Sequence, residues 1–143
     1  MGSFGFATAE TMLDAGFLPD AISSDVHSLS IKGPAYDQLV TLSKFMHLGM
    51  ELRDIIAAST TGPAKAIQRP DLGTLSPGSI GDATIIEIEN ATTNYVDSLG
   101  ETRVGDKKFT LKGIVLNGSW WHQPSSSVNC TPKRREQISA IIS

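Results

Sequence analysis

The sequence is poor in the residues that define several common classes of protein. It has one cysteine, Cys130, among 143 residues, which excludes an internal disulfide framework and a metal site made of several thiolates. No hydrophobic run approaches the roughly 20 residues of a membrane-spanning helix. Basic residues are not in excess, because 12 Lys and Arg stand against 15 Asp and Glu. We therefore expect neither nucleic acid nor a membrane among the partners.

What remains is an ordinary globular composition. Hydrophobic residues make up 40% of the chain and charged residues 19%, as is typical of globular proteins. A chain of this length can bury a substantial core. The first residues lack the pattern of a signal peptide, so the expected location is the cytoplasm.

The chain divides near Arg69 and Pro70 into a helical half and a half of strands and turns. Apolar residues recur at helical spacing in residues 7–15, 34–48 and 51–58, which predicts three helices. A further short helix is expected after Thr60 or Thr61, either of which could cap it.

After residue 70 the pattern changes to β-branched residues separated by turn signals. Residues 98–101 predict a turn, and Trp120 and Trp121 read as the apolar end of the last strand. Residues 122–143 are rich in polar residues and are expected to form a disordered tail. Strands are predicted over residues 83–89, 92–96, 108–112 and 114–116.

Asp25 is the first candidate for chemistry. It ends a short stretch, residues 21–25, that predicts a buried strand followed by a carboxylate. Catalytic residues of parallel α/β barrels stand at the carboxyl ends of strands. The alternative is that Asp25 caps the turn that follows, and its position alone favours this simpler interpretation.

The histidines do not form a recognisable ligand set. His27 lies two residues after Asp25, but an Asp-x-His pair is a weak metal signal. His47 falls on a predicted helix and is expected to be a partly buried helix residue, and His122 is expected to be structural or exposed. A catalytic zinc usually takes three protein ligands, and no local motif supplies them. Ser23 and Ser24 lack the Gly-x-Ser-x-Gly elbow of a serine nucleophile.

Three segments, taken together and in this order, resemble the C-terminal third of the amidohydrolase superfamily. They are Pro-Asp-Ala-Ile-Ser-Ser-Asp-Val-His at 19–27, Thr-Thr-Gly-Pro-Ala at 60–64, and Gly-Thr-Leu-Ser-Pro-Gly-Ser-Ile-Gly-Asp-Ala-Thr-Ile at 73–85. The best match is the amidohydrolase/deacetylase branch of metallohydrolases, relatives of dihydroorotase and D-aminoacylase. One departure is Gly81, where the family usually has Ala.

The resemblance implies a fold and a division of the chain. Residues 1–69 would be the end of a (β/α)8 TIM barrel, with strand eight and the closing helices. Residues 70–121 would be the C-terminal part of a small β-sandwich domain, and 122–143 the tail. In the isolated chain we expect an α+β fold, with two or three helices packed on a small, mainly antiparallel sheet and the first strand isolated.

The resemblance also implies roles for three residues. Asp25 would ligate a divalent metal ion, most simply zinc, take a proton from the attacking water and pass it to the leaving group. Ser24 and His27 would support that ligand without touching the metal. The family's other ligands are a His-x-His pair, a carboxylated Lys and two further His, and all precede the segment that this sequence matches.

Two functions follow as hypotheses from these residues. The chain is the C-terminal portion of a metal-dependent hydrolase of small-molecule amides or esters, and we expect it to be inactive alone. The alternative is a non-catalytic truncated product or subunit, which needs a separate N-terminal chain or forms a homo-oligomer through open strand edges. A third option is a small binding module that uses Trp120 and Trp121.

Overall fold

The computed structural model describes residues 4–26 and 37–121, and four helices and three strands lie within them. The predicted α+β class is confirmed. The helices come first in the chain and the strands after residue 82, and the sheet is antiparallel throughout. The helices are α1 (Phe6–Asp14), α2 (Gln38–His47), α3 (Leu52–Ser59) and α4 (Thr61–Ala66), and the strands are β1 (Ala83–Val96), β2 (Thr102–Leu116) and β3 (Ser119–Trp121).

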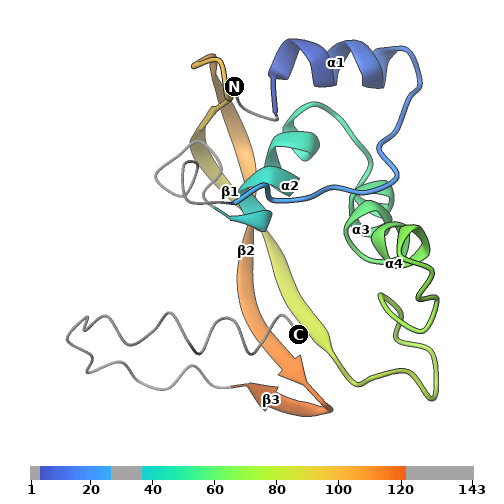
Figure 1. Ribbon diagram of the computed structural model, residues 1–143. Helices are drawn as coiled ribbons and strands as arrows, with labels where there is room; N and C mark the ends of the chain where they lie inside the picture. The colour runs from blue at the N-terminus through green and yellow to red at the C-terminus, as the bar shows by residue number, and fades with distance from the viewer. Residues whose placement is uncertain (1–3, 27–36, 122–143) are drawn as a thin grey trace, which may run out of the picture.

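A long antiparallel ribbon of β1 and β2 forms one side of the molecule (Figure 1). The pairing runs from Ala83 opposite Val115 to Val96 opposite Thr102, with irregularities after Ile85 and after Asn90. The segments predicted as separate strands therefore form two continuous ones. The bulges interrupt the alternation of side chains without ending the hydrogen-bonded ladder, so each strand looks broken in the sequence.

The two tryptophans belong to a strand of their own. Asn117 and Gly118 both have positive φ, 51° and 73°, and they form the tight turn between β2 and β3. An Asn-Gly pair is a strong signal for a two-residue hairpin turn. Trp120 and Trp121 do end the last strand, as predicted, but that strand is β3, and the turn that separates it from β2 was missed.

The helices largely follow the predicted periodicity. α1 and α3 match the expected ranges within one residue at each end, and α2 begins at Gln38, where the Asp37 side chain accepts a 2.8 Å hydrogen bond from the Val40 N–H. Residues 34–36 of the predicted helix lie outside the described residues. Thr60 precedes α4, but its hydroxyl donates to the Ile56 carbonyl 2.6 Å away instead of capping.

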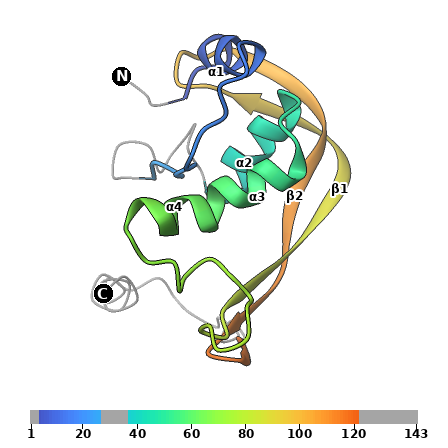
Figure 2. The ribbon, with the colours of Figure 1, turned by 90° about the vertical axis from the view of Figure 1, so that its right-hand side faces the viewer.

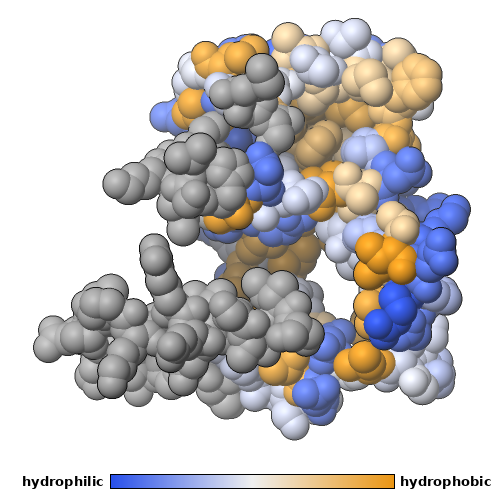
Figure 3. All heavy atoms as spheres, in the orientation of Figure 1, coloured by the Kyte–Doolittle hydropathy of each residue, from blue (hydrophilic) through white to orange (hydrophobic). Residues whose placement is uncertain are grey.

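Many large hydrophobic side chains remain exposed on the described part of the chain. One group lies on α1 and the loop after it, where Figure 3 shows hydrophobic residues at the surface. Another follows the ribbon and β3. The exposed residues are Met12, Phe17 and Leu18 in the first group, and Ile85, Ile88, Val104, Leu111, Leu116, Trp120 and Trp121 in the second.

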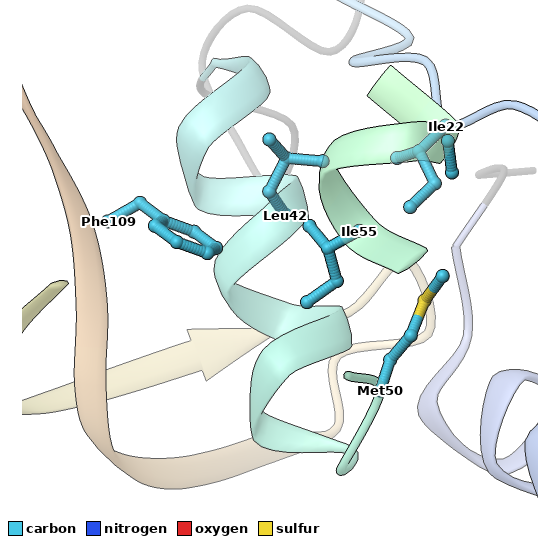
Figure 4. Close-up of a cluster of buried hydrophobic side chains, with 6 residues drawn as sticks. Ile22, Leu42, Met50, Ile55 and Phe109 are labelled. Atoms are coloured by element: carbon cyan, nitrogen blue, oxygen red, sulfur yellow. The ribbon is translucent and has the colours of Figure 1, made fainter. Parts of the chain in front are cut away.

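The core lies between the ribbon and helices α2 and α3, which sit on one side of the ribbon (Figure 2). Figure 4 shows Phe109 of β2 pointing toward Leu42 on α2, with Ile55 of α3 beside them. Ser43 links α2 to β2, because its buried hydroxyl accepts a 2.9 Å hydrogen bond from the Phe109 N–H. The cluster consists of Ile22, Leu42, Met50, Ile55, Ala58 and Phe109.

Candidate functional site

The segment that carries Asp25 is fixed at Ile22. The Ile22 side chain is buried, its N–H donates to the Ala58 carbonyl at 2.7 Å, and its own carbonyl accepts from Gln38 Nε2 at 2.8 Å. The end of α3 and the start of α2 therefore hold this one residue from two sides. The segment from Ser23 onward leaves the core at this point.

The predicted buried strand over residues 21–25 does not form. These residues have no secondary structure, and among them only Ile22 is buried. The backbone hydrogen bonds of Ile22 go to a helix end and to a glutamine side chain. A strand needs a neighbouring strand to satisfy its alternate N–H and C=O groups, and in the described residues every strand lies in the ribbon sheet.

Asp25 lies at the exposed end of this segment, with a φ of 50°. Its N–H donates to Ser23 Oγ at 3.3 Å, and the Val26 N–H lies 3.5 Å from Ser24 Oγ. Asp adopts the left-handed conformation more readily than most residues, because its short polar side chain can bond locally. The two serine hydroxyls thus accept from the backbone around Asp25, so they shape this turn.

His47, the one histidine within the described residues, packs against aromatic rings. His47 is half-buried on α2, with its ring 6.5 Å from the Phe6 ring and 6.0 Å from the Tyr95 ring between centroids. The interpretation of His47 as a partly buried helix residue is confirmed. His27 and His122 lie outside the described residues.

The donor set does not by itself make a metal site. Within residues 4–26 and 37–121 no group of three or more His, Cys, Asp or Glu side chains could hold a metal ion.

In the same ranges, no helix is long and apolar enough to cross a membrane.

A second polar cluster, which the sequence did not single out, surrounds Asp97. Its carboxylate is buried and accepts from the N–H groups of Phe6 at 3.0 Å, Leu99 at 2.8 Å and Glu101 at 2.8 Å. Burial alone would raise the pKa of Asp97, but these backbone donors together hold the pKa below its ordinary value. The available signal was an Asp at the start of a turn with Gly100; its partner Phe6 could not be found by spacing.

Lys44 on α2 is the buried cation of this region. Its ammonium lies 5.3 Å from the centre of the Phe4 ring. Burial lowers the pKa of Lys44, and the charge of Asp97 opposes that shift. The Asp97 charge and the Phe4 ring favour the cation and offset part of the cost of burial, which gives Lys44 a structural role.

The comparison with known families agrees with the motifs. The profile of the amidohydrolase family matches residues 4–121. The chain belongs to the amidohydrolase family. Amidohydrolases are generally metal-dependent hydrolases.

Similar proteins come from several bacteria. A deacetylase of Brucella anthropi is 35% identical over 114 residues, which are 80% of this chain and 28% of that protein. A deacetylase of Agrobacterium fabrum is 32% identical over 114 residues, again 80% and 28%. A deacetylase of Enterococcus faecalis is 32% identical over 117 residues, 81% of this chain and 32% of that protein. The chain thus spans about a third or less of the relatives it matches.

Two solved structures share the fold of this part. A crystal structure of an adenine deaminase has a TM-score of 0.80 and 31% identity, with 85% of this chain and 33% of that one covered. A crystal structure of a dihydroorotase has a TM-score of 0.72 and 28% identity, with 82% and 31% covered. The described arrangement of helices and ribbon therefore recurs within larger amidohydrolases.

Proposed function

We propose that this chain contributes one catalytic carboxylate, Asp25, to a metal-dependent deacetylase that hydrolyses an acyl amide or ester of a small molecule. The observation that carries the proposal is the position of Asp25. It lies exposed at the end of a segment anchored at Ile22, in a chain whose relatives are named deacetylases. Its role there is to accept a proton from the attacking water and to return it to the leaving group.

The metal ion of such an enzyme, which we propose to be zinc, would need further ligands. A catalytic zinc takes about three protein ligands, and the described residues offer Asp25 without a cluster around it. These residues alone do not fit a metal ion, and we assign no step to one. Ser24, and in the same proposal His27, support the turn at Asp25, and we expect the chain to be inactive without the other ligands.

The first test uses the chain by itself. We expect a calorimetric zinc titration to show no tight stoichiometric binding, and an assay with acetylated amino acids to show no turnover. Tight zinc binding together with hydrolysis would show that residues of this chain, including those outside the described ranges, complete the site unaided.

The second test places Asp25 in a complete enzyme. Residues 4–121 replace the matched segment of the Brucella anthropi deacetylase, and Asp25→Asn is then introduced. We expect turnover to fall about 10²- to 10⁴-fold, the usual effect of losing a general acid–base group. Asp20→Asn is the matched control, because Asp20 is an exposed carboxylate on the same segment. Equal activities of the two variants would contradict the proposed role of Asp25.

The alternative proposal is a non-catalytic subunit that joins a separate N-terminal chain or a second copy of itself. The observations that favour it are the exposed hydrophobic residues on the ribbon and the outer edge of β1, which pairs with no strand in the described residues. Unpaired edges are templates for pairing with other chains. The oligomeric state in solution distinguishes pairing with a second copy of this chain from a requirement for a separate N-terminal chain.

A further inference from the structure

Helix α1 has few of the local features that make a short helix persist. It has nine residues, and isolated helices shorter than about 12–15 residues are marginal in water. Its N-cap is Gly5, which forms no side-chain cap, and its first turn contains no acidic residue. The Thr11 hydroxyl donates back to the Ala7 carbonyl at 2.8 Å, which slightly disfavours a helix. Only its C-terminus is locally defined, by Gly16 at a φ of 80°.

Packing compensates little for these deficits. Phe6 is the only buried residue of α1, and Leu13 packs against the core while partly exposed. Below the helix lies an apolar groove of about 230 Å³, with Met12 and Leu13 on one wall and Phe45 of α2 on another. A helix that lies over a groove makes fewer van der Waals contacts than one packed onto a filled core.

Asp97, in the turn between β1 and β2, supplies the N-cap that Gly5 does not provide. The ribbon tip, residues 97–101, joins β1 to β2. Asp97 Oδ2 accepts from the Phe6 N–H at 3.0 Å, and its other oxygen, Oδ1, accepts from the N–H groups of Leu99 and Glu101. One carboxylate therefore shapes the ribbon tip and caps a helix 91 residues away in the sequence.

Ser98 and Arg103 make further contacts to the first half of α1 and to the segment before it. Ser98 donates to the Phe4 carbonyl from both its hydroxyl, at 2.6 Å, and its N–H, at 2.9 Å. Arg103 makes a two-pronged ion pair with Glu10, at 3.0 and 3.2 Å, and its guanidinium lies 4.9 Å from the centre of the Phe6 ring. These attachments connect residues 4–10, which include the first half of α1, to residues 97–103 at and beside the ribbon tip.

We propose that α1 is an order–disorder element, which is helical only while its first turn is docked on the ribbon tip and which unfolds by itself when that docking is lost. Asp97 is the group that sets the docked population, because it supplies the cap that the helix lacks. Unfolding of α1 removes one wall of the groove and frees the chain that leads to residues 17–26. The proposal does not depend on hydrolysis at Asp25.

Hydrogen exchange measured by mass spectrometry on the full chain tests this proposal. In the native protein at low urea, amides of residues 6–14 are expected to exchange faster than those of α2 and α3, with a rate that hardly depends on urea, as local opening requires. Exchange of α1 and α2 at the same rate and with the same urea dependence would overturn the proposal. This comparison needs no variant.

Substitution of the cap gives a second readout. In Asp97→Asn we expect the α1 amides to exchange about 10- to 100-fold faster, the usual range for the loss of a hydrogen bond to a charged group, while α2 and α3 change little. Asp71→Asn is the control, since Asp71 is an exposed carboxylate paired with Arg69. An unchanged α1 in Asp97→Asn, or equal acceleration across the whole chain, would refute the special role of Asp97. If Asp97→Asn fails to fold, Glu10→Gln serves as the milder variant, with faster exchange confined to α1 as the expected result.

Discussion

Asp97 shows how a single buried residue makes the stability of this chain depend on pH. Burial alone would raise the pKa of Asp97, but the backbone N–H groups of Phe6, Leu99 and Glu101 hold its folded-state pKa below the ordinary carboxyl value of about 3.9. A depressed pKa means that the stabilisation is fully present above about pH 5, where the carboxyl is charged in both the folded and the unfolded state, and is lost as the pH falls through the folded-state pKa.

We therefore expect the free energy of unfolding, measured with urea at a series of pH values, to fall as the pH drops below about 5. The fall should be less steep in Asp97→Asn, which cannot titrate at this position. Glu10 and Asp71 also have lowered pKa values, through Arg103 and Arg69, but both are exposed and contribute little. Parallel pH profiles for the two proteins would show that Asp97 does not carry this dependence.

Asp25 differs from the buried Asp97 in that its side chain is exposed. Backbone bonds at Ile22 fix the segment it belongs to, yet Asp25 itself is exposed and lies in the left-handed region. The role that we propose for Asp25 comes from its place in the family motif, while the described structure gives its position and exposure. Its chemistry depends on groups that the described residues do not place beside it.

Among the elements, α2 and β2 form the joint that connects the helical half to the ribbon. Ser43 contributes to it with a hydroxyl that accepts from the Phe109 N–H and donates to the Leu39 carbonyl at 2.6 Å. Ser43 and Phe109 are both buried, so no water replaces the bond between them when it is lost. The hydroxyl is thus worth more here than on a surface helix.

Ser43→Ala is expected to lower the free energy of unfolding by about 1–3 kcal/mol, the cost of leaving a buried N–H unsatisfied. Ser59→Ala is the control, because that hydroxyl bonds only within its own helix region, to the Ile56 carbonyl. Thermal or urea unfolding measures both. Equal losses in the two variants would show that the Ser43–Phe109 bond adds nothing to the joint.

For the whole molecule, the exposed ribbon determines how the chain behaves in solution. The outer edge of β1 has no strand partner in the described residues, and Ile88 on this strand is 40% exposed. Bulges and the charged residues Glu87 and Glu89, which pair with Lys112 and Lys108, blunt this edge in part. The remaining hydrophobic surface favours association.

We expect light scattering after size exclusion to show a molar mass that rises with protein concentration. Ile88→Lys should shift the distribution toward the monomer, because it places a charge within the hydrophobic face of the strand. Leu99→Lys should not, since Leu99 is 83% exposed but lies in the ribbon tip outside both strands. A strict monomer at every concentration would contradict self-association and favour a requirement for a different partner.

The sequence by itself determined the local structure and the family. Helical periodicity placed α1 and α3 within one residue at each end, and Gly100 marked the turn between the long strands. The motifs at residues 19–27, 60–64 and 73–85 indicated an amidohydrolase, which the family match confirms. These features are readable because each depends on neighbours within a few residues.

Only the tertiary structure decided which distant groups meet. It placed the Phe6 N–H on Asp97 and Phe109 against Leu42, and it left residues 21–25 without a strand partner. Such contacts depend on how whole elements pack, and no spacing in a single sequence reports that. The same limit applies to the candidate site, where the sequence identified Asp25 and the fold set its exposure.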